Sequence, residues 1–203
     1  IIENLIAIIS RGLFREKLST SQQIYSKHSL NELLFEIYGH DSSTVIHCNN
    51  TSENSEKVAE NFCLPTQSIQ TIKWAAFLHD IGKIFIPPEI LYKPGFLSPE
   101  EWKIMKLHSE IGSQIVYLMT GLQPVSEIVA THHEHYDGSG YPFGLSGENI
   151  PFTSRILEVA DSFEAMTESR VYQTIKSKEE AKRELIDFSG TQFDPNVVKV
   201  FLE

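Results

Sequence analysis

The sequence has few cysteines, few basic residues and no long apolar run. Cys48 and Cys63 show neither CxxC nor zinc-finger spacing, which indicates reduced, apolar residues in a cytoplasmic protein. The 17 Lys+Arg stand against 27 Asp+Glu, a net charge of −10, which argues against a nucleic-acid polymer as partner because phosphate contacts need a basic face. No apolar run approaches the roughly 20 residues that span a membrane, and no signal-peptide pattern is present.

Strand patterns are also missing, since no useful period-two alternation occurs along the chain. Apolar residues instead recur at helical spacing in several runs, among them 69–78, 104–115 and 125–132. Residues 98–101, Ser-Pro-Glu-Glu, are typical of a helix start with a capping box and proline at the first helical position. The sequence therefore predicts an all-α fold.

Residues 1–40 form a separate helical segment in this interpretation, followed by one domain over residues 41–203. The segment is either an extra helical layer on the core or a linker from a regulatory domain outside this sequence, in which case it would support a homodimer. The chain begins at Ile1 rather than methionine, so we expect it to be part of a longer protein.

Several local boundaries follow from the same patterns. The polar stretch up to Ser55 reads as a loop or helix start, with a helix over about 56–63, and Gly82 reads as a helix C-cap. Thr153 or Ser154 reads as the N-cap of the helix that follows. Further helices are expected at about 178–188 and at the C-terminus, after a turn that starts at Gly190.

Several histidines and carboxylates interrupt or end apolar helical runs. They are His79, Asp80, His108, His132, His133 and Asp161. Because a buried polar group is costly unless it is paired or bound to a metal, their number favours a metal cluster. Neighbouring residues on a helix point about 100° apart. Asp80, which has two oxygens, can nevertheless bridge two ions while His79 binds one.

Taken singly, these residues have plain structural interpretations. His79 and Asp80 could form a hydrogen-bonded pair at a helix end. His108 could be a core histidine whose ring nitrogens are hydrogen-bonded within the protein. Asp161 could form a salt bridge with Arg155 or Arg170. Lys83 either reaches a bound phosphate or is a solvated lysine that complements the helix dipole.

Assembled, the motifs resemble the HD-GYP subgroup of the HD-domain metal-dependent phosphohydrolases. Residues 79–83 read HDIGK, residues 132–142 match HHExxDGxGYP, and 160–172 and 190–195 follow two further blocks of the family. The resemblance implies an HD-domain helical bundle with additional N-terminal helices. It also implies two divalent ions, most often iron or manganese, and hydrolysis of cyclic di-GMP to linear pGpG and/or GMP by a hydroxide that bridges the metals.

The resemblance also assigns residue roles. One ion would be held by His47, His79, Asp80 and Asp161, and the other by Asp80, His108, His132 and His133. His47 enters through the Thr44-x-x-His47 pattern. Asp80 and Lys83 would be catalytic, Lys83 and Arg170 would contact the phosphate, and the pocket mouth would be formed by Asp137, Gly140, Tyr141 and Pro142. This GYP loop, residues 137–142, would also offer a surface to a signalling-protein partner.

The chain departs from the family pattern at four positions. Ser43 stands where some relatives place a glutamate that holds a third metal, so two metals are expected. Glu164 replaces an aspartate, Val171 a proline and Gln173 a frequently basic residue. The loss of a positive group leaves two alternatives open. One is a metal-loaded receptor that binds cyclic di-GMP with little cleavage, and the other is a phosphodiesterase for another cyclic dinucleotide.

Overall fold

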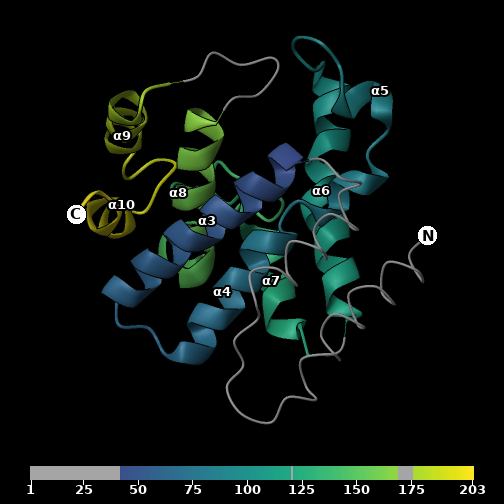
Figure 1. Cartoon of the computed structure of the whole chain (residues 1–203). Helices are drawn as coiled ribbons and strands as arrows, with labels where there is room; N and C mark the ends of the chain where they lie inside the picture. Colours follow the sequence, from purple (N-terminus) through teal and green to yellow (C-terminus); the bar gives the residue numbers. More distant parts are fainter. Residues whose placement is uncertain (1–41, 120, 169–175) are drawn as a thin grey trace.

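The computed structural model describes residues 42–119, 121–168 and 176–203, and within them the chain is helical (Figure 1). The α-helices are α3 (Ser42–Asn61), α4 (Thr66–Leu78), α5 (Pro88–Leu91), α6 (Pro99–Tyr117), α7 (Gln123–Thr131), α8 (Phe152–Thr167), α9 (Lys178–Asp187) and α10 (Pro195–Leu202), with 3-10 helices η1 (Ile81–Phe85) and η2 (Gly147–Asn149). These ranges contain no β-strand, so the all-α prediction is confirmed.

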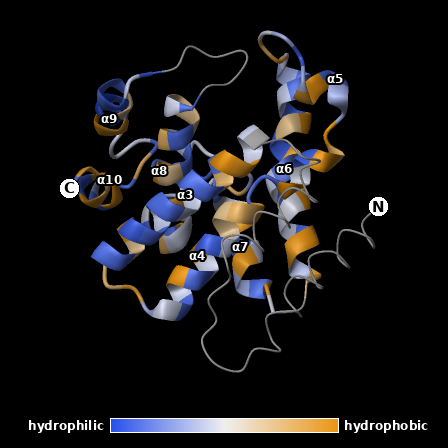
Figure 2. Cartoon of the chain, viewed as in Figure 1, coloured by the Kyte–Doolittle hydropathy of each residue, from blue (hydrophilic) through white to orange (hydrophobic). Residues whose placement is uncertain are grey.

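Helix α4 packs against three other α-helices. It contacts α3, α7 and α8, while α6 contacts α7 and η1 (Figure 1). Ile72, Ala75, Ala76 and Leu78 of α4 are fully buried, and apolar and polar positions alternate along the surrounding helices (Figure 2). Because the C-terminal half of α4 is buried on most sides, the residues that follow its last turn enter the protein interior.

One helix start follows the predicted capping chemistry, and a second has a side-chain cap that was not predicted. Ser98 accepts a hydrogen bond from the backbone N–H of Glu101, and Glu101 Oε2 accepts one from the backbone N–H of Ser98 at 2.7 Å, the reciprocal pair of a capping box. Asp194 caps α10 by accepting from the backbone N–H of Asn196. Such starts are predictable because all of their partners lie within three residues.

Of the two interpretations of the polar stretch up to Ser55, the loop is wrong, and the helix expected at about 56–63 begins earlier, because α3 is continuous from Ser42 to Asn61. Thr51, Ser52 and Ser55 are buried within this helix, and Asn54 donates a hydrogen bond to Glu164 of α8 at 2.6 Å. The polar residues of α3 therefore form a helix face that packs against the protein rather than a solvated loop.

Two predicted caps are also wrong. Helix α8 begins at Phe152 after Pro151, with no side-chain cap, and Ser154 pairs its hydroxyl with Thr131 of α7 at 2.8 Å. Gly82 does not end α4 but lies buried inside η1. A Cβ atom at Gly82 would lie 1.9 Å from the carbonyl oxygen of His108, so this glycine allows η1 to approach α6 closely.

Some predictions fall on residues outside the described ranges. These are the N-terminal segment 1–40 and the positions Arg170, Val171 and Gln173. Among the helices that the structure describes, none is long and apolar enough to cross a membrane.

Candidate metal centre

The seven residues that the resemblance marks as ligands come from separate helices and converge in the interior. His47 lies on α3 and Asp161 on α8, His79 and Asp80 follow α4, and His108 lies on α6. His132 and His133 directly follow α7. The structure brings six of them into two adjacent groups, each with donor atoms within 4.8 Å of one another, and the seventh, Asp80, lies between the groups. Sites of this size fit a metal ion in each group.

The first group consists of His47, His79 and Asp161. Asp161 Oδ1 lies 2.9 Å from His47 Nε2 and 3.5 Å from His79 Nε2. Arg155, one of the two alternative partners of Asp161, instead pairs with Asp194 at 2.5 Å, and the other, Arg170, lies outside the described residues. Within the described part of the chain, Asp161 therefore faces the imidazoles of the group.

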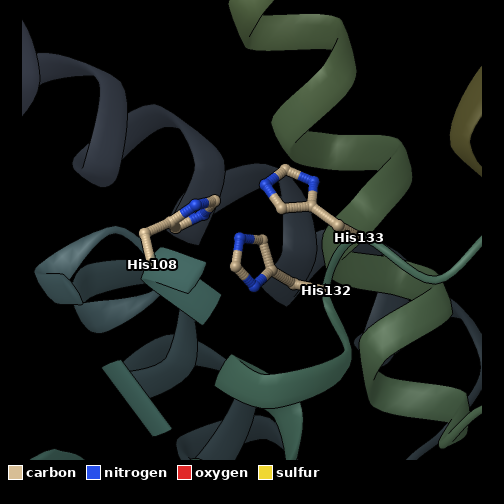
Figure 3. A group of neighbouring side chains, drawn as sticks. All are labelled: His108, His132 and His133. Carbon is tan, nitrogen blue, oxygen red and sulfur yellow. The ribbon is translucent and has the colours of Figure 1, made fainter. Parts of the chain in front are cut away.

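The second group consists of His108, His132 and His133, whose imidazole rings gather around a shared space (Figure 3). Ring centroids are 5.4 Å apart for His108 and His132, and 5.1 Å apart for His108 and His133. The Nε2 atoms of His108 and His132 are buried and have no hydrogen-bond partner among the described residues. A buried nitrogen lone pair without a partner is costly, and a bound cation removes that cost.

Asp80 lies between the two groups. Its Oδ2 is 3.5 Å from His79 Nε2 in the first group, and its Oδ1 is 3.6 Å from His108 Nε2 in the second. Lys83 Nζ also donates to Asp80 Oδ2 at 2.6 Å. The two oxygens of one carboxylate thus face two different groups, which is the arrangement that a bridging ligand needs.

Three of the histidines are held by backbone carbonyls three residues earlier in the chain. The Nδ1 atoms of His79, His108 and His132 lie 2.7–2.8 Å from the carbonyl oxygens of Ala76, Met105 and Val129. A carbonyl can only accept, so each Nδ1 carries the proton and each Nε2 presents its lone pair to the site. The helix backbone therefore fixes both the orientation and the tautomer of these rings.

Burial and neighbouring charges set the protonation of the site. Burial lowers the pKa of His108, His132 and His133, for His133 to about 3, so these rings are neutral donors. Burial alone would raise the pKa of Asp80, but Lys83 and His79 outweigh it and hold that pKa well below its ordinary value. Neutral imidazoles beside ionised carboxylates are the protonation states that metal ligands require.

These pKa shifts predict how the stability of the metal-free protein depends on pH. Below pH 6.5 the unfolded chain protonates His133, whereas the folded chain resists protonation until about pH 3. The free energy of unfolding therefore falls as the pH is lowered from 7.5 to 5. We expect a Tm about 5 °C lower at pH 5 in thermal unfolding of metal-free protein. An equal or higher Tm at pH 5 would contradict the protonation states given above.

The chain directly after the GYP loop, residues 137–142, is held by a residue whose role the sequence did not reveal. Buried Glu134 accepts hydrogen bonds from the backbone N–H groups of Phe143 at 2.6 Å and Leu145 at 2.8 Å. A Cβ atom at Gly140 would lie 2.2 Å from the backbone nitrogen of His135. The loop thus folds tightly onto the backbone that follows the His132–His133 pair. The only signal for Glu134 was its place in the HHE motif.

Of the loop residues, Tyr141 lies beside the second group and Asp137 lies away from it. The ring of Tyr141 packs on that of His133, with 4.8 Å between centroids, and Lys106 Nζ lies 5.3 Å above the Tyr141 ring. Asp137 instead accepts from the backbone N–H of Ser139 and is exposed. Tyr141 therefore borders the second group, whereas Asp137 stabilises the turn of its own loop.

Comparisons with known proteins agree with this geometry. The chain is 46% identical over 165 residues to a cyclic di-GMP phosphodiesterase of Thermotoga maritima, covering 80% of this chain and 45% of that protein. It is 37% identical over 180 residues to 3'3'-cGAMP-specific phosphodiesterase 2 of Vibrio cholerae, covering 88% and 34%. The chain thus spans less than half the length of these curated relatives.

A solved structure and a family model also agree with the motifs. An HDG"Y"P protein from Bdellovibrio bacteriovorus superposes with a TM-score of 0.64 at 20% identity, covering 99% of this chain and 63% of that one. A family model described as HD domain matches residues 13–197. The resemblance found in the motifs is confirmed, and the chain belongs to the HD domain family.

Proposed function

We propose that this chain is a metal-dependent phosphodiesterase that hydrolyses cyclic di-GMP to linear pGpG and/or GMP. The observation that carries the proposal is the position of Asp80, with one oxygen toward His79 and the other toward His108. A catalytic pair of metals needs such a shared ligand, whereas a structural histidine cluster does not.

The residues present fit two divalent ions, most often iron or manganese in this family. The first ion would be held by His47, His79, Asp80 and Asp161, and the second by Asp80, His108, His132 and His133. Imidazole and carboxylate donors suit these metals, and the buried, unpartnered Nε2 atoms of His108 and His132 support the assignment. A pair of bound metals lowers the pKa of water and neutralises charge on a phosphoryl group.

The chain's own residues bind and orient the phosphodiester. Lys83, which reaches Asp80 from η1, supplies a positive charge beside the metal centre for the non-bridging phosphate oxygens. Arg170, outside the described residues, has the same proposed role. Asp137, Gly140, Tyr141 and Pro142 shape the mouth of the site, and Tyr141 is the loop residue whose ring packs on a proposed ligand.

A second candidate substrate is 3'3'-cGAMP. The observation that favours it is the match to the Vibrio cholerae phosphodiesterase named for that compound, which covers 88% of this chain. The two substrates differ in one base, whereas the phosphodiester chemistry is the same. Both candidates therefore use the same metal centre.

The test incubates anaerobically purified, metal-reconstituted protein with cyclic di-GMP and, separately, with 3'3'-cGAMP, and separates the products by chromatography. We expect metal-dependent formation of pGpG or GMP from cyclic di-GMP. Cleavage of 3'3'-cGAMP alone would establish the second candidate. Binding of cyclic di-GMP with no product after long incubation would replace the proposal by a metal-loaded receptor.

The GYP loop also offers a surface for a protein partner. We propose that the GYP loop also meets a signalling-protein partner, a role supported by the exposed ring of Phe143 directly after it. A domain boundary near residue 41, a homodimer formed through residues 1–40 and a cytoplasmic location remain predictions from the sequence. The HD domain match begins at residue 13, inside that N-terminal segment.

A further inference from the structure

His47 differs from three other histidines of the site in what its Nδ1 atom faces. The Nδ1 atoms of His79, His108 and His132 lie against backbone carbonyl oxygens. The Nδ1 atom of His47 lies at ion-pair distance, 3.3 Å, from a side-chain carboxylate oxygen, Oε2 of Glu168, without a hydrogen bond between them in this structure. Its other ring nitrogen, Nε2, lies 2.9 Å from Asp161. Two carboxylates thus face the two nitrogens of one imidazole.

Both carboxylates belong to the same stretch of chain. Asp161 lies in α8, and Glu168 is the C-cap of that helix, with its backbone N–H donating to the carbonyl of Glu164. Seven residues span about two helical turns, so Asp161 and Glu168 lie on the same side of α8. The side chain of Glu168 is only 13% exposed. A carboxylate this buried needs a partner, and the imidazole of His47 is next to it.

A neighbouring contact fixes the distance between the two helices. Glu164, one turn before Glu168, accepts a hydrogen bond from Asn54 of α3 at 2.6 Å. His47 lies two turns before Asn54 on the same face of α3. The Asn54–Glu164 contact therefore holds the end of α8 against α3, where Glu168 meets His47.

We propose, on the basis of the metal-dependent function proposed above, that Glu168 is a positioning residue for His47. When a metal replaces the proton on Nε2 of His47, the Glu168 carboxylate accepts the Nδ1–H and holds the ring with its Nε2 lone pair directed at the first metal. Carboxylate–histidine–metal contacts of this kind contribute about 10–100-fold to metal affinity. The effect is confined to the first group, because His47 is a member of that group alone.

The first test compares Mn²⁺ binding by wild-type protein, Glu168→Ala and Glu168→Gln, with free Mn²⁺ followed by electron paramagnetic resonance. We expect Glu168→Ala to weaken one Mn²⁺ site about 10–100-fold and to leave the other unchanged. Glu168→Gln retains an accepting oxygen, so we expect it to lose less Mn²⁺ affinity than Glu168→Ala. Glu168 borders a hollow of about 630 Å³ that is open to solvent, so its truncation leaves no sealed cavity. Glu60→Ala, on the exposed side of α3, is the matched control.

The second test follows the Nδ1–H of His47 in protein loaded with diamagnetic Zn²⁺, by proton–nitrogen correlation NMR of the imidazole groups. We expect an Nδ1–H resonance protected from solvent exchange in the wild type and a faster-exchanging one in Glu168→Ala. Unchanged exchange of this proton together with unchanged Mn²⁺ affinities would overturn the proposal. Wild-type protein that fails to cleave cyclic dinucleotides would refute the proposed function without altering either reading, so the two failures are distinguishable.

Discussion

Replacing Asp80 by alanine is expected to abolish turnover and metal retention together. Asp80 is the residue whose oxygens face both groups, and it also pairs with Lys83. Without it, each group loses an anionic ligand and Lys83 is left as an unpaired positive charge beside the site. We expect kcat to fall at least about 1,000-fold, which corresponds to about 4 kcal/mol of barrier. Product chromatography and elemental analysis of the purified variant measure both effects.

Two variants serve as controls for Asp80→Ala. Asp80→Asn keeps the side-chain volume but removes the charge, so it separates loss of ligation from loss of packing, and we expect it to retain the fold and lose activity. Asp187→Ala removes an exposed aspartate from α9 and is expected to behave as wild type. Full activity and full metal content in Asp80→Ala would refute the shared-ligand account.

Replacing Gly82 by alanine is expected to have the largest effect on stability. The added Cβ atom would lie 1.9 Å from the carbonyl oxygen of His108 and 2.7 Å from the backbone nitrogen of Gly112. Because both atoms belong to the backbone of α6, a change of side-chain rotamer cannot relieve the clash. We expect η1 to separate from α6, with a loss of about 3 kcal/mol or more of unfolding free energy. Denaturant unfolding measures this loss.

We expect the displacement of η1 in Gly82→Ala to disturb the metal centre as well. Gly82 lies between Asp80 and Lys83 in sequence and against His108 in space, so any folded Gly82→Ala protein is expected to bind metal weakly. Gly95→Ala is the control, because a Cβ atom there meets nothing within 4 Å. Its positive φ limits the expected cost to about 1–2 kcal/mol. Equal unfolding midpoints for Gly82→Ala and wild type would show that the close approach is not required.

The parts of the fold that the sequence predicted depend on local signals. The capping box at Ser98 involves residues three apart, and the continuous apolar pattern of α4 reflects its burial. The polar residues of α3 were misread as a loop because their partners, such as Glu164 for Asn54, are about one hundred residues away. Gly82 was misread for the same reason, since its neighbour His108 belongs to another helix.

The candidate site was predictable as a set of residues but not as a geometry. The HDIGK and HHExxDGxGYP motifs pointed to the ligand candidates, and the chance of bridging by Asp80 followed from its two oxygens. The sequence could not show that Arg155 pairs with Asp194 rather than Asp161. It also gave no role to Glu134 or Glu168, because each acts on a loop or a ring that only the folded chain brings within reach.

The most direct test of the two-metal account is anomalous diffraction from crystals of manganese-loaded protein, measured at the manganese absorption edge. The account predicts two peaks, one among His47, His79 and Asp161 and the other among His108, His132 and His133, with Asp80 between them. A single peak confined to one group, or peaks away from both groups, would contradict it.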